Sequence, residues 1–218
     1  MMKTTVRGLA AAALTLLPLL TASLAHAAET LPLDAAITSL PLADESRTGY
    51  QRTSFKHWVD ADRDGCSTRA EVLIDESRTA PVIEAGCKVI SGEWFSYYDG
   101  AVVTAPGGLD IDHMVPLAEA WDSGASGWTP ARREAYANDL GAERSLVAVT
   151  AKTNRSKSDQ DPAQWLPPLA DARCTYVTDW VSTKLRWQLT ADTAERDALR
   201  ALAEGCGQET VKYQPASA

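Results

Sequence analysis

An aspartate and a histidine stand side by side in GLDIDHMVPLAEAW, residues 108–121, among residues that otherwise read as buried core. A histidine with its ordinary pKa of about 6.5 can take a proton from water near neutral pH. A carboxylate beside it can bind a hard divalent cation. Asp112 and His113 therefore predict a hydrolytic site at the end of a hydrophobic strand. Taken alone, His113 would more often be a hydrogen-bonded core histidine.

A second polar group follows another short apolar stretch. SLVAV, residues 145–149, reads as a strand, and the polar helix or turn after it carries Asn154, Arg155 and Lys157, with Thr150 as a candidate cap. The carbonyl oxygen of Asn154 suits a hard cation, and the two basic side chains offer positive charge for a phosphate. Arg155 and Lys157 could instead form a solvated face.

The pattern around these groups predicts a single domain of mixed α and β structure. Strands are expected at 109–113 and 145–149, extended structure at 93–104, a short helix at 50–58 and a helix or strand pair at 71–90. Helices are expected after Pro116, from Thr129-Pro130 to about residue 140, and over the C-terminal third, where the last one starts at Thr190. Adjacent residues of a regular strand point to opposite faces, so Asp112 and His113 need a bend to serve one site.

Joined in this order, DHMVPLAEAWDSGA and SLVAVTAKTNRSKSDQDPAQW resemble the HNH (His-Me finger) endonucleases. The likeness is greatest to exported HNH proteins related to the C-terminal domain of GmrSD-type restriction endonucleases, and it covers about residues 94–168. It implies an α+β fold in which a ββα-metal (HNH) core is embedded in a mainly helical, disulfide-stapled domain at 50–210. It also implies phosphodiester hydrolysis that leaves a 5′-phosphate and a 3′-hydroxyl.

The resemblance assigns a role to each polar residue. His113 matches the general base, and Asp112 and Asn154 match the ligands of a single Mg²⁺ or another hard divalent ion. Arg155 and Lys157 would contact the substrate phosphate. Three residues are candidates for a supporting role: Glu119, which is about as readily an ordinary exposed helix residue, Ser145, which stands where many HNH proteins have asparagine behind the catalytic histidine, and Asn138, which could substitute for that asparagine.

The N-terminus indicates export. Lys3 and Arg7 precede an Ala- and Leu-rich stretch, and Ala25-His26-Ala27 fits a cleavage site, so residues 1–27 are expected to be a secretory signal peptide. The apolar stretch is short for a membrane span of about 20 residues, so an extracellular protein without membrane attachment is expected. Residues 28–49 show little periodicity and are expected to form a loosely ordered lead-in.

The net charge limits how a nucleic acid could bind. It changes from −8 to −10 once residues 1–27 are removed, because Lys3 and Arg7 leave and no acid does. A polyanion must therefore meet a local basic patch. Because no separate recognition module is evident, we expect DNA to be bound with little sequence preference, by a monomer; RNA stays open as a substrate.

Four cysteines remain in the exported chain: Cys66, Cys87, Cys174 and Cys206. An even number in an exported protein favours two disulfides, and the lack of a C-x-x-C pair disfavours zinc. Three pairings are possible. We expect the local one, Cys66–Cys87 and Cys174–Cys206.

A second candidate metal site lies upstream. DADRDGCSTRAE, residues 60–71, has the spacing of an EF-hand loop, with Asp60, Asp62, Asp64 and the twelfth-place Glu71 as candidate Ca²⁺ ligands. A helix should enter and leave such a loop, and Cys66 occupies its seventh place. A solvated acidic turn is the alternative.

The sequence thus predicts a secreted, divalent-metal-dependent endonuclease. Two alternatives stay open. One is an extracellular calcium-binding module that keeps an inactive HNH core, and the other is a phosphodiesterase that acts on small molecules.

Overall fold

The computed structural model describes residues 27–217, so the expected signal peptide lies outside the described residues except for Ala27. The helices are α1 (Leu33–Ser39), α2 (Thr68–Asp75), α3 (Leu117–Asp122), α4 (Pro130–Ala137), α5 (Ala151–Lys157), α6 (Arg173–Trp187) and α7 (Thr193–Ala203). The strands are β1 (Glu29–Pro32), β2 (Val82–Glu84), β3 (Lys88–Ser91), β4 (Trp94–Ser96), β5 (Ala101–Val103), β6 (Leu109–His113), β7 (Leu146–Thr150) and β8 (Thr210–Tyr213).

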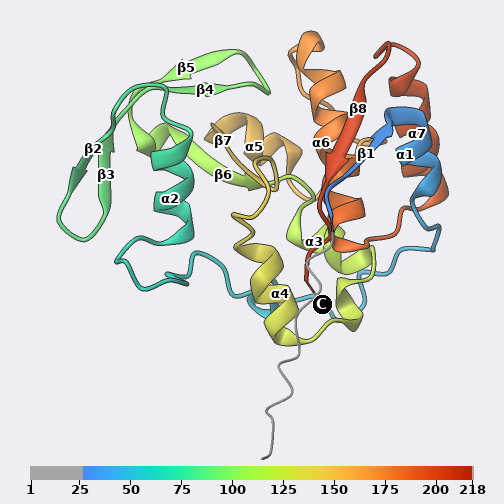
Figure 1. The fold of residues 1–218 in the computed structure, drawn as a ribbon, viewed down its shortest axis with the longest axis horizontal. Coiled ribbons are helices and arrows are strands. Elements are labelled where there is room, and N and C mark those ends of the chain that lie inside the picture. The colour runs from blue at the N-terminus through green and yellow to red at the C-terminus, as the bar shows by residue number, and fades with distance from the viewer. Residues whose placement is uncertain (1–26, 218) are drawn as a thin grey trace, which may run out of the picture.

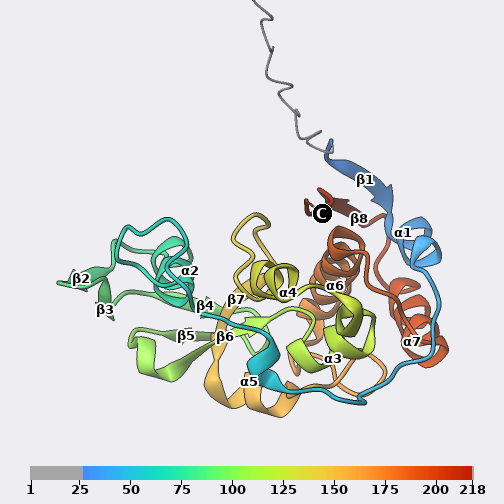
Figure 2. The ribbon, with the colours of Figure 1, turned by 90° about the horizontal axis from the view of Figure 1, so that it is seen from below.

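The strands form four antiparallel pairs rather than one sheet: β1 with β8, β2 with β3, β4 with β5, and β6 with β7. Figure 1 shows α2 and the two hairpins β2–β3 and β4–β5 on one side of the molecule, and α6, α7, α1 and the β1–β8 pair on the other. The β6–β7 pair lies between the two sides, with α5 beside it (Figure 2). The expected mixture of α and β structure is confirmed.

Two hydrophobic clusters correspond to these two sides. The smaller one packs Leu73 and Trp94 against Ile111 and Leu146, and so fixes the outer side of β6–β7. The larger one gathers the apolar faces of α1, α3 and α6, with Tyr176 and Trp180 fully buried. The strand pair is therefore held between two cores, which makes it a rigid support.

The N-terminal segment is better ordered than its sequence suggested. β1 pairs with β8, and α1 buries Leu33, Ala36 and Ile37, followed by Leu40. These residues recur at three- and four-residue spacing, which is the pattern of a helix with one apolar face. The expectation of a loosely ordered lead-in is therefore wrong. Its partner strand β8 was not expected either.

Other boundaries shift by a few residues. The expected helix at 50–58 is only a 3₁₀ turn at Arg52–Ser54. Helix α7 starts at Thr193, because the side chain of Asp192, not Thr190, accepts a hydrogen bond from the backbone N–H of Glu195. The residues expected at 71–90 form the end of α2 and the β2–β3 hairpin.

Both disulfides join the expected cysteines. Cys66–Cys87 ties the loop before α2 to the β2–β3 turn, and Cys174–Cys206 ties the start of α6 to the end of α7. Each bridge therefore fastens an outer element on one side of β6–β7. Among the described residues, no helix is both long and apolar enough to cross a membrane.

Candidate active site

The two predicted polar groups meet because β6 and β7 are antiparallel neighbours. Asp112 stands opposite Val147 and His113 opposite Leu146, and α5 starts directly after β7. The chain therefore returns beside the end of β6 and presents Asn154 there. The ββα-metal core that the resemblance implied stays a prediction.

A cavity of about 270 Å³ opens at this corner. It brings together three of the expected residues, Asp112, His113 and Asn154, with Arg155 at its edge. The other residues that line it are Arg52, Ile111, Pro116, Leu117, Ser158 and Asp159. An acid, an imidazole and an amide from three elements thus share one small space.

The tautomer of His113 follows from a single contact. Its Nε2 lies 3.0 Å from the carbonyl oxygen of Ala137, which can only accept, so Nε2 carries the proton and Nδ1 keeps a free lone pair. Burial lowers the pKa of His113 to about 3, and the positive charge of Arg52 acts in the same direction. The ring is therefore neutral at ordinary pH, with one nitrogen able to accept a proton.

Aromatic rings fix the plane of this imidazole. The Trp58 ring lies 5.4 Å from that of His113, tilted by 30°, and the Tyr136 ring lies 6.4 Å away and nearly parallel. His57 is the other neighbour, at 6.4 Å between ring centroids, but its Nδ1 contacts the carbonyl oxygen of Phe55. His57 does not line the cavity, whereas His113 does.

Asp112 is held from behind. Its Oδ2 accepts hydrogen bonds from Lys157 Nζ at 2.5 Å and from the Tyr98 hydroxyl at 2.6 Å. No described residue hydrogen-bonds its Oδ1. Burial raises the pKa of this carboxyl group, against the opposing charge of Lys157. The aspartate thus has one oxygen fixed by the protein and one available to a ligand.

Lys157 differs from its expected role. Its side chain is completely buried, and its Nζ also donates to the carbonyl oxygens of His113 and Met114, at 3.0 and 2.9 Å. Three partners satisfy the three donors of an ammonium group. Lys157 therefore cannot reach a substrate phosphate in this conformation, and it holds the Asp112–His113 corner instead.

Asn154 and Arg155 lie at the open side of the cavity. The Asn154 side-chain nitrogen lies 3.4 Å from Asp110 Oδ2, which is a long contact. The side-chain oxygen of Asn154 accepts no hydrogen bond from the described residues. Arg155 pairs with the same carboxylate at 3.2 Å, and its side chain is 74% exposed. An exposed pair of this kind contributes little to stability, so Arg155 can exchange Asp110 for a phosphate at small cost.

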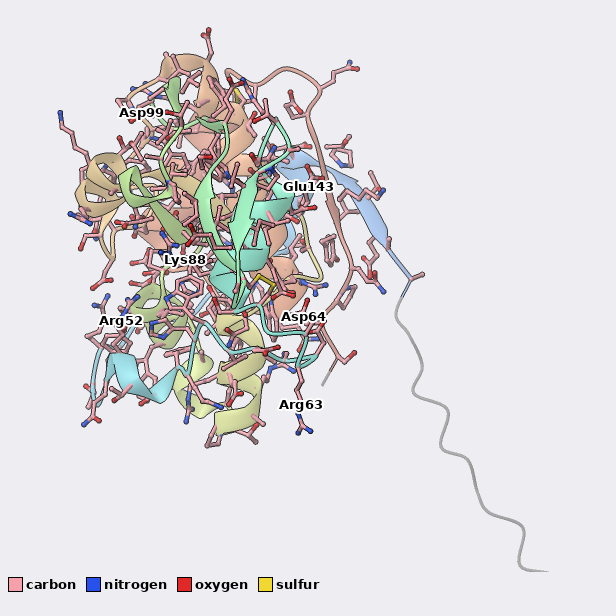
Figure 3. All side chains as sticks on the ribbon, turned by 90° about the vertical axis from the view of Figure 1, so that its left-hand side faces the viewer. Arg52, Arg63, Asp64, Lys88, Asp99 and Glu143 are labelled. Carbon is pink, nitrogen blue, oxygen red and sulfur yellow. A yellow bond between two sulfur atoms is a disulfide. The ribbon has the colours of Figure 1, made fainter. Side chains whose placement is uncertain are left out.

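Sequence reasoning missed Arg52, which lines the cavity from the 3₁₀ turn. Figure 3 shows it on the turn at one edge of the molecule. Nothing in its local sequence marks it, because the contact joins segments far apart in the chain. Sequence reasoning also missed Trp58, whose ring contact with His113 likewise depends on the tertiary fold.

Asn138 supports His113 indirectly. Its side chain donates to the carbonyl oxygens of Lys56 and Glu134 and accepts from the N–H of Val59 and the hydroxyl of Thr68. These bonds anchor both ends of the segment that carries Trp58, and Asn138 directly follows Ala137, the partner of Nε2. These contacts favour the supporting role that the sequence predicted for Asn138, and that role stays a prediction.

Ser145 supports the other side of the same corner. Its backbone oxygen accepts from the N–H of Met114 at 3.0 Å, and its hydroxyl donates to Asp139 at 2.7 Å. Asp139 is in turn held by two bonds from Arg186 and one from the Trp187 indole. Ser145 thus connects the residue after His113 to helix α6.

Glu119 does not adjoin this cavity. Its carboxylate binds Lys184 at 2.9 Å and accepts from Ser123 at 2.8 Å, between α3 and α6. The side chain is 3% exposed. Glu119 is therefore neither a support of Asp112 nor an exposed helix residue.

The EF-hand-like loop gathers three of its four candidate ligands. Carboxylate oxygens of Asp60, Asp62 and Asp64 lie within 4.8 Å of one another, and all three residues are exposed. Asp64 projects from the edge of the molecule in Figure 3. Glu71 lies on α2, where burial and the three aspartates raise its pKa. Helix α2 leaves the loop, but only the 3₁₀ turn precedes it.

The fold and the cavity define a disulfide-bonded protein of mixed α and β structure with a polar site suited to hydrolysis. The chain belongs to the family of GmrSD restriction endonucleases, C-terminal domain, whose family model matches residues 67–202. This family indicates an endonuclease of nuclease type, and therefore a nucleic-acid substrate. The predicted resemblance is confirmed.

One relative is an uncharacterized secreted protein of Arthroderma benhamiae. It is 42% identical over 158 residues, which cover 72% of this chain and 76% of the relative. A secreted relative and the two disulfides agree with an extracellular location for this chain. No solved structure matches the chain significantly.

Proposed function

We propose that this protein is a secreted, divalent-metal-dependent endonuclease that hydrolyses phosphodiester bonds of DNA. The observation that carries the proposal is the shared cavity, which His113, Asp112 and Asn154 line together, with the Nδ1 of His113 and one oxygen of Asp112 left without a hydrogen bond from the described residues. Each group is left unused by the protein itself, whereas its other atoms are fixed by hydrogen bonds.

The residues at the cavity fit a hard metal ion. Asp112 Oδ1 and the Asn154 carbonyl oxygen are the available donors, and Mg²⁺ commonly takes one or two protein groups and keeps several waters. When bound there, such an ion supplies charge stabilisation for the phosphate and the departing oxygen. Tyr98 and Lys157 orient Asp112 for this purpose.

His113 is the proposed general base. Its neutral ring can accept a proton at Nδ1 from an attacking water, while the Ala137 carbonyl prevents the ring from turning. Burial lowers the pKa of the ring to about 3 in the absence of substrate, and the positive charges of Arg52 and Lys157 act in the same direction. A bound phosphate is an anion, so it raises the proton affinity of Nδ1 when substrate is present.

Arg52 and Arg155 are the proposed phosphate contacts. Both line the cavity and replace the buried Lys157 in that role. They supply the local positive charge that an acidic protein needs for a polyanion. Contacts to phosphate position a nucleic acid but do not read its bases, so weak sequence preference is expected.

The test is magnesium-dependent nicking of a supercoiled plasmid by the secreted chain. His113→Ala should lower the rate by about 10²–10⁴-fold, the usual contribution of a general base, without unfolding the protein. His57→Ala is the matched control, because it removes the neighbouring imidazole that does not line the cavity. Equal losses in both variants, or nicking by His113→Ala at the wild-type rate, would disprove the assignment.

Substrate choice and calcium binding distinguish the proposed endonuclease from a small-molecule phosphodiesterase and from a calcium-binding module. Faster hydrolysis of a small activated phosphodiester than of a plasmid, judged by kcat/KM, would favour a small-molecule phosphodiesterase. Calcium binding at residues 60–71 without any nicking would favour a binding module with an inactive core. Single-stranded RNA tested beside the plasmid decides whether DNA alone is cut.

A further inference from the structure

A second group of acids lies away from the cavity, between α3 and the segment that joins α1 to the 3₁₀ turn. Carboxylate oxygens of Glu45, Glu119 and Asp122 lie within 4.8 Å of one another, and this trio is called the Glu45 cluster below. Carboxylate oxygens of Glu45, Asp161 and Asp192 likewise lie within 4.8 Å of one another. Figure 2 shows the connecting segment, coloured blue to cyan, passing α7 along the edge of the molecule.

The Glu45 cluster contains buried oxygens that lack a partner. Asp122 Oδ1 and Glu45 Oε1 are both buried and accept no hydrogen bond from a donor group of the described residues, and the neighbour of the Glu45 carboxyl group is the carboxyl group of Glu119, with which it can share a proton. The side chain of Asp122 is only 6% exposed, and its other oxygen already binds Arg47 at 2.6 Å. A buried carboxylate oxygen without a donor is costly, so these atoms indicate a missing ligand.

A third group without a partner lies nearby and belongs to a different element. The hydroxyl of Tyr176, on α6, is fully buried and has no hydrogen-bond partner among the described residues. Burial raises its pKa, as do the charges of Asp112, Asp161 and Glu119. The Tyr176 hydroxyl is thus within electrostatic range of acids at the cavity and of acids in and beside the Glu45 cluster.

The charges around the cluster do not balance. Lys184 binds both Glu119 and Glu195, and Arg47 binds both Asp122 and Asp159. Each cation thus has two carboxylates, and Glu45 forms no ion pair with any described residue. Burial and the neighbouring Glu119 raise the pKa of Glu45 to about 8, as expected for an acid forced close to others.

We propose that the Glu45 cluster binds one calcium ion, which joins the segment at residue 45 to helix α3. Glu45, Glu119 and Asp122 are the ligands, and Asp161 and Asp192 are close enough to Glu45 to complete the shell. The site is separate from the catalytic cavity and from the loop at residues 60–71.

Ligand type and spacing favour calcium. Oxygens on opposite sides of a Ca²⁺ ion, each at 2.3–2.6 Å, are roughly 4.6–5.2 Å apart, so oxygens that lie within 4.8 Å of one another can share one such ion. Zinc prefers nitrogen and sulfur ligands, and the cluster has neither. Mg²⁺ demands an octahedron of shorter bonds and rarely takes an all-protein cage. Calcium is also the ion expected to be plentiful outside cells, where the relative is found.

The position of the site gives the ion a structural task. The backbone at residue 43 is already bonded to Ala191, next to Asp192, so the segment reaches α7 as well. Arg47 connects Asp122 to Asp159, which lines the catalytic cavity. An ion here would therefore fasten the segment that leads to Arg52 against the helices behind the active site.

The test counts bound calcium in a background without the other two candidate metal sites. Asp62→Asn and Asn154→Ala, combined in the full secreted chain, remove a ligand from the loop and from the cavity. After treatment with a chelator, this protein should bind one Ca²⁺ by isothermal titration and gain thermal stability. Adding Glu45→Gln should abolish both effects, whereas adding Glu84→Gln, an exposed acid on β2, should change neither.

Two outcomes would overturn the proposal. One is no binding in the background protein, with stability that depends on pH alone; Glu45 and Glu119 would then share a proton instead of an ion. The other is unchanged binding after Glu45→Gln. If that variant is poorly folded by circular dichroism, Asp122→Asn replaces it, since asparagine can still accept from Arg47 but loses the charge.

Discussion

Two lysines are buried among residues 27–217, and their surroundings differ. Lys157 ends α5 and Lys184 lies on α6, and both side chains are completely enclosed. Both ammonium groups approach the ring of Trp180, at 5.8 and 5.5 Å from its centroid. They therefore share one aromatic wall, yet each belongs to a different polar network.

Lys157 faces one carboxylate and Lys184 faces two. Burial lowers the pKa of Lys157 more than Asp112 can raise it. Burial also lowers the pKa of Lys184, but Glu195 and Glu119 together raise it above the ordinary value. One network is a neutral pair that supports a catalytic corner, and the other has surplus negative charge.

The comparison shows what each network is for. A neutral pair keeps Asp112 fixed while one of its oxygens stays available, which suits a metal ligand. The surplus of acids near Lys184 continues into the Glu45 cluster, which suits the capture of a further cation. Buried ion pairs are weak evidence for stability as such, so position and function better explain why these groups are buried.

The largest expected effect on stability comes from replacing either buried lysine by methionine. Loss of one partner from a buried pair costs about 3–5 kcal/mol of unfolding free energy. Lys184→Met should lie at the upper end or beyond, because it leaves two acids unpaired, and Lys157→Met at the lower end, because Tyr98 still donates to Asp112. Urea denaturation measures both losses.

The loss of nicking activity should be larger in Lys157→Met than in Lys184→Met, which is the reverse of the order expected for the loss of stability. Lys157→Met should lower plasmid nicking sharply under conditions where the variant remains folded, because Asp112 loses its orientation. Lys184→Met should nick at nearly the wild-type rate under such conditions. Parallel losses of stability and activity in the two variants would show that the networks do not have separate roles.

The sequence predicted the parts of this site that depend on local pattern. The β6 and β7 strands, the polar helix after them and both disulfides follow from apolar runs, caps and cysteine spacing. Asn154 lines the same cavity as Asp112 and His113 because α5 directly follows the antiparallel β6–β7 pair, and the roles of the three residues stay predictions. The resemblance to known endonucleases supplied the roles.

The features of the site that the sequence did not predict depend on contacts between segments far apart in the chain. Lys157 was expected to be exposed, because a lysine in a polar helix normally is, yet the helix turns it toward Asp112. Arg52 and Trp58 reach His113 across the fold, so no local pattern marks them. The Glu45 cluster unites acids from separate elements, and no spacing in the sequence would reveal it.

Glu76, a half-buried acid that pairs with no lysine, provides a reference for both networks. Glu76 accepts a hydrogen bond from the N–H of Ala148 on β7, and burial raises its pKa to about 7. Because the folded pKa exceeds the ordinary 4.5, the stability linked to Glu76 is complete below that value and is lost as the pH rises through 7.

The loss at Glu76 should be on the order of 3 kcal/mol between pH 4.5 and pH 8, since each pKa unit corresponds to 1.36 kcal/mol. Glu76→Gln should remove that part of the pH dependence and leave stability at low pH nearly unchanged. Urea midpoints of the variant and the wild type across this range measure it. Parallel profiles would show that Glu76 is already solvated.

The smallest effect is expected at the exposed loop, which contrasts with the Glu45 cluster, where Glu119 is buried and Glu45 and Asp122 are half-buried. If Asp60, Asp62 and Asp64 bind Ca²⁺, free calcium at ten times the dissociation constant should stabilise the protein by about 1.4 kcal/mol. Asp62→Asn should reduce this gain, although its side chain can still accept from the N–H of Asp64.

Added salt should weaken calcium binding at the exposed loop more than at the Glu45 cluster, because water and ions screen exposed charges. Calcium titrations of Asp62→Asn and Glu45→Gln at low and high ionic strength compare the two sites, and equal salt dependence would contradict their difference in burial.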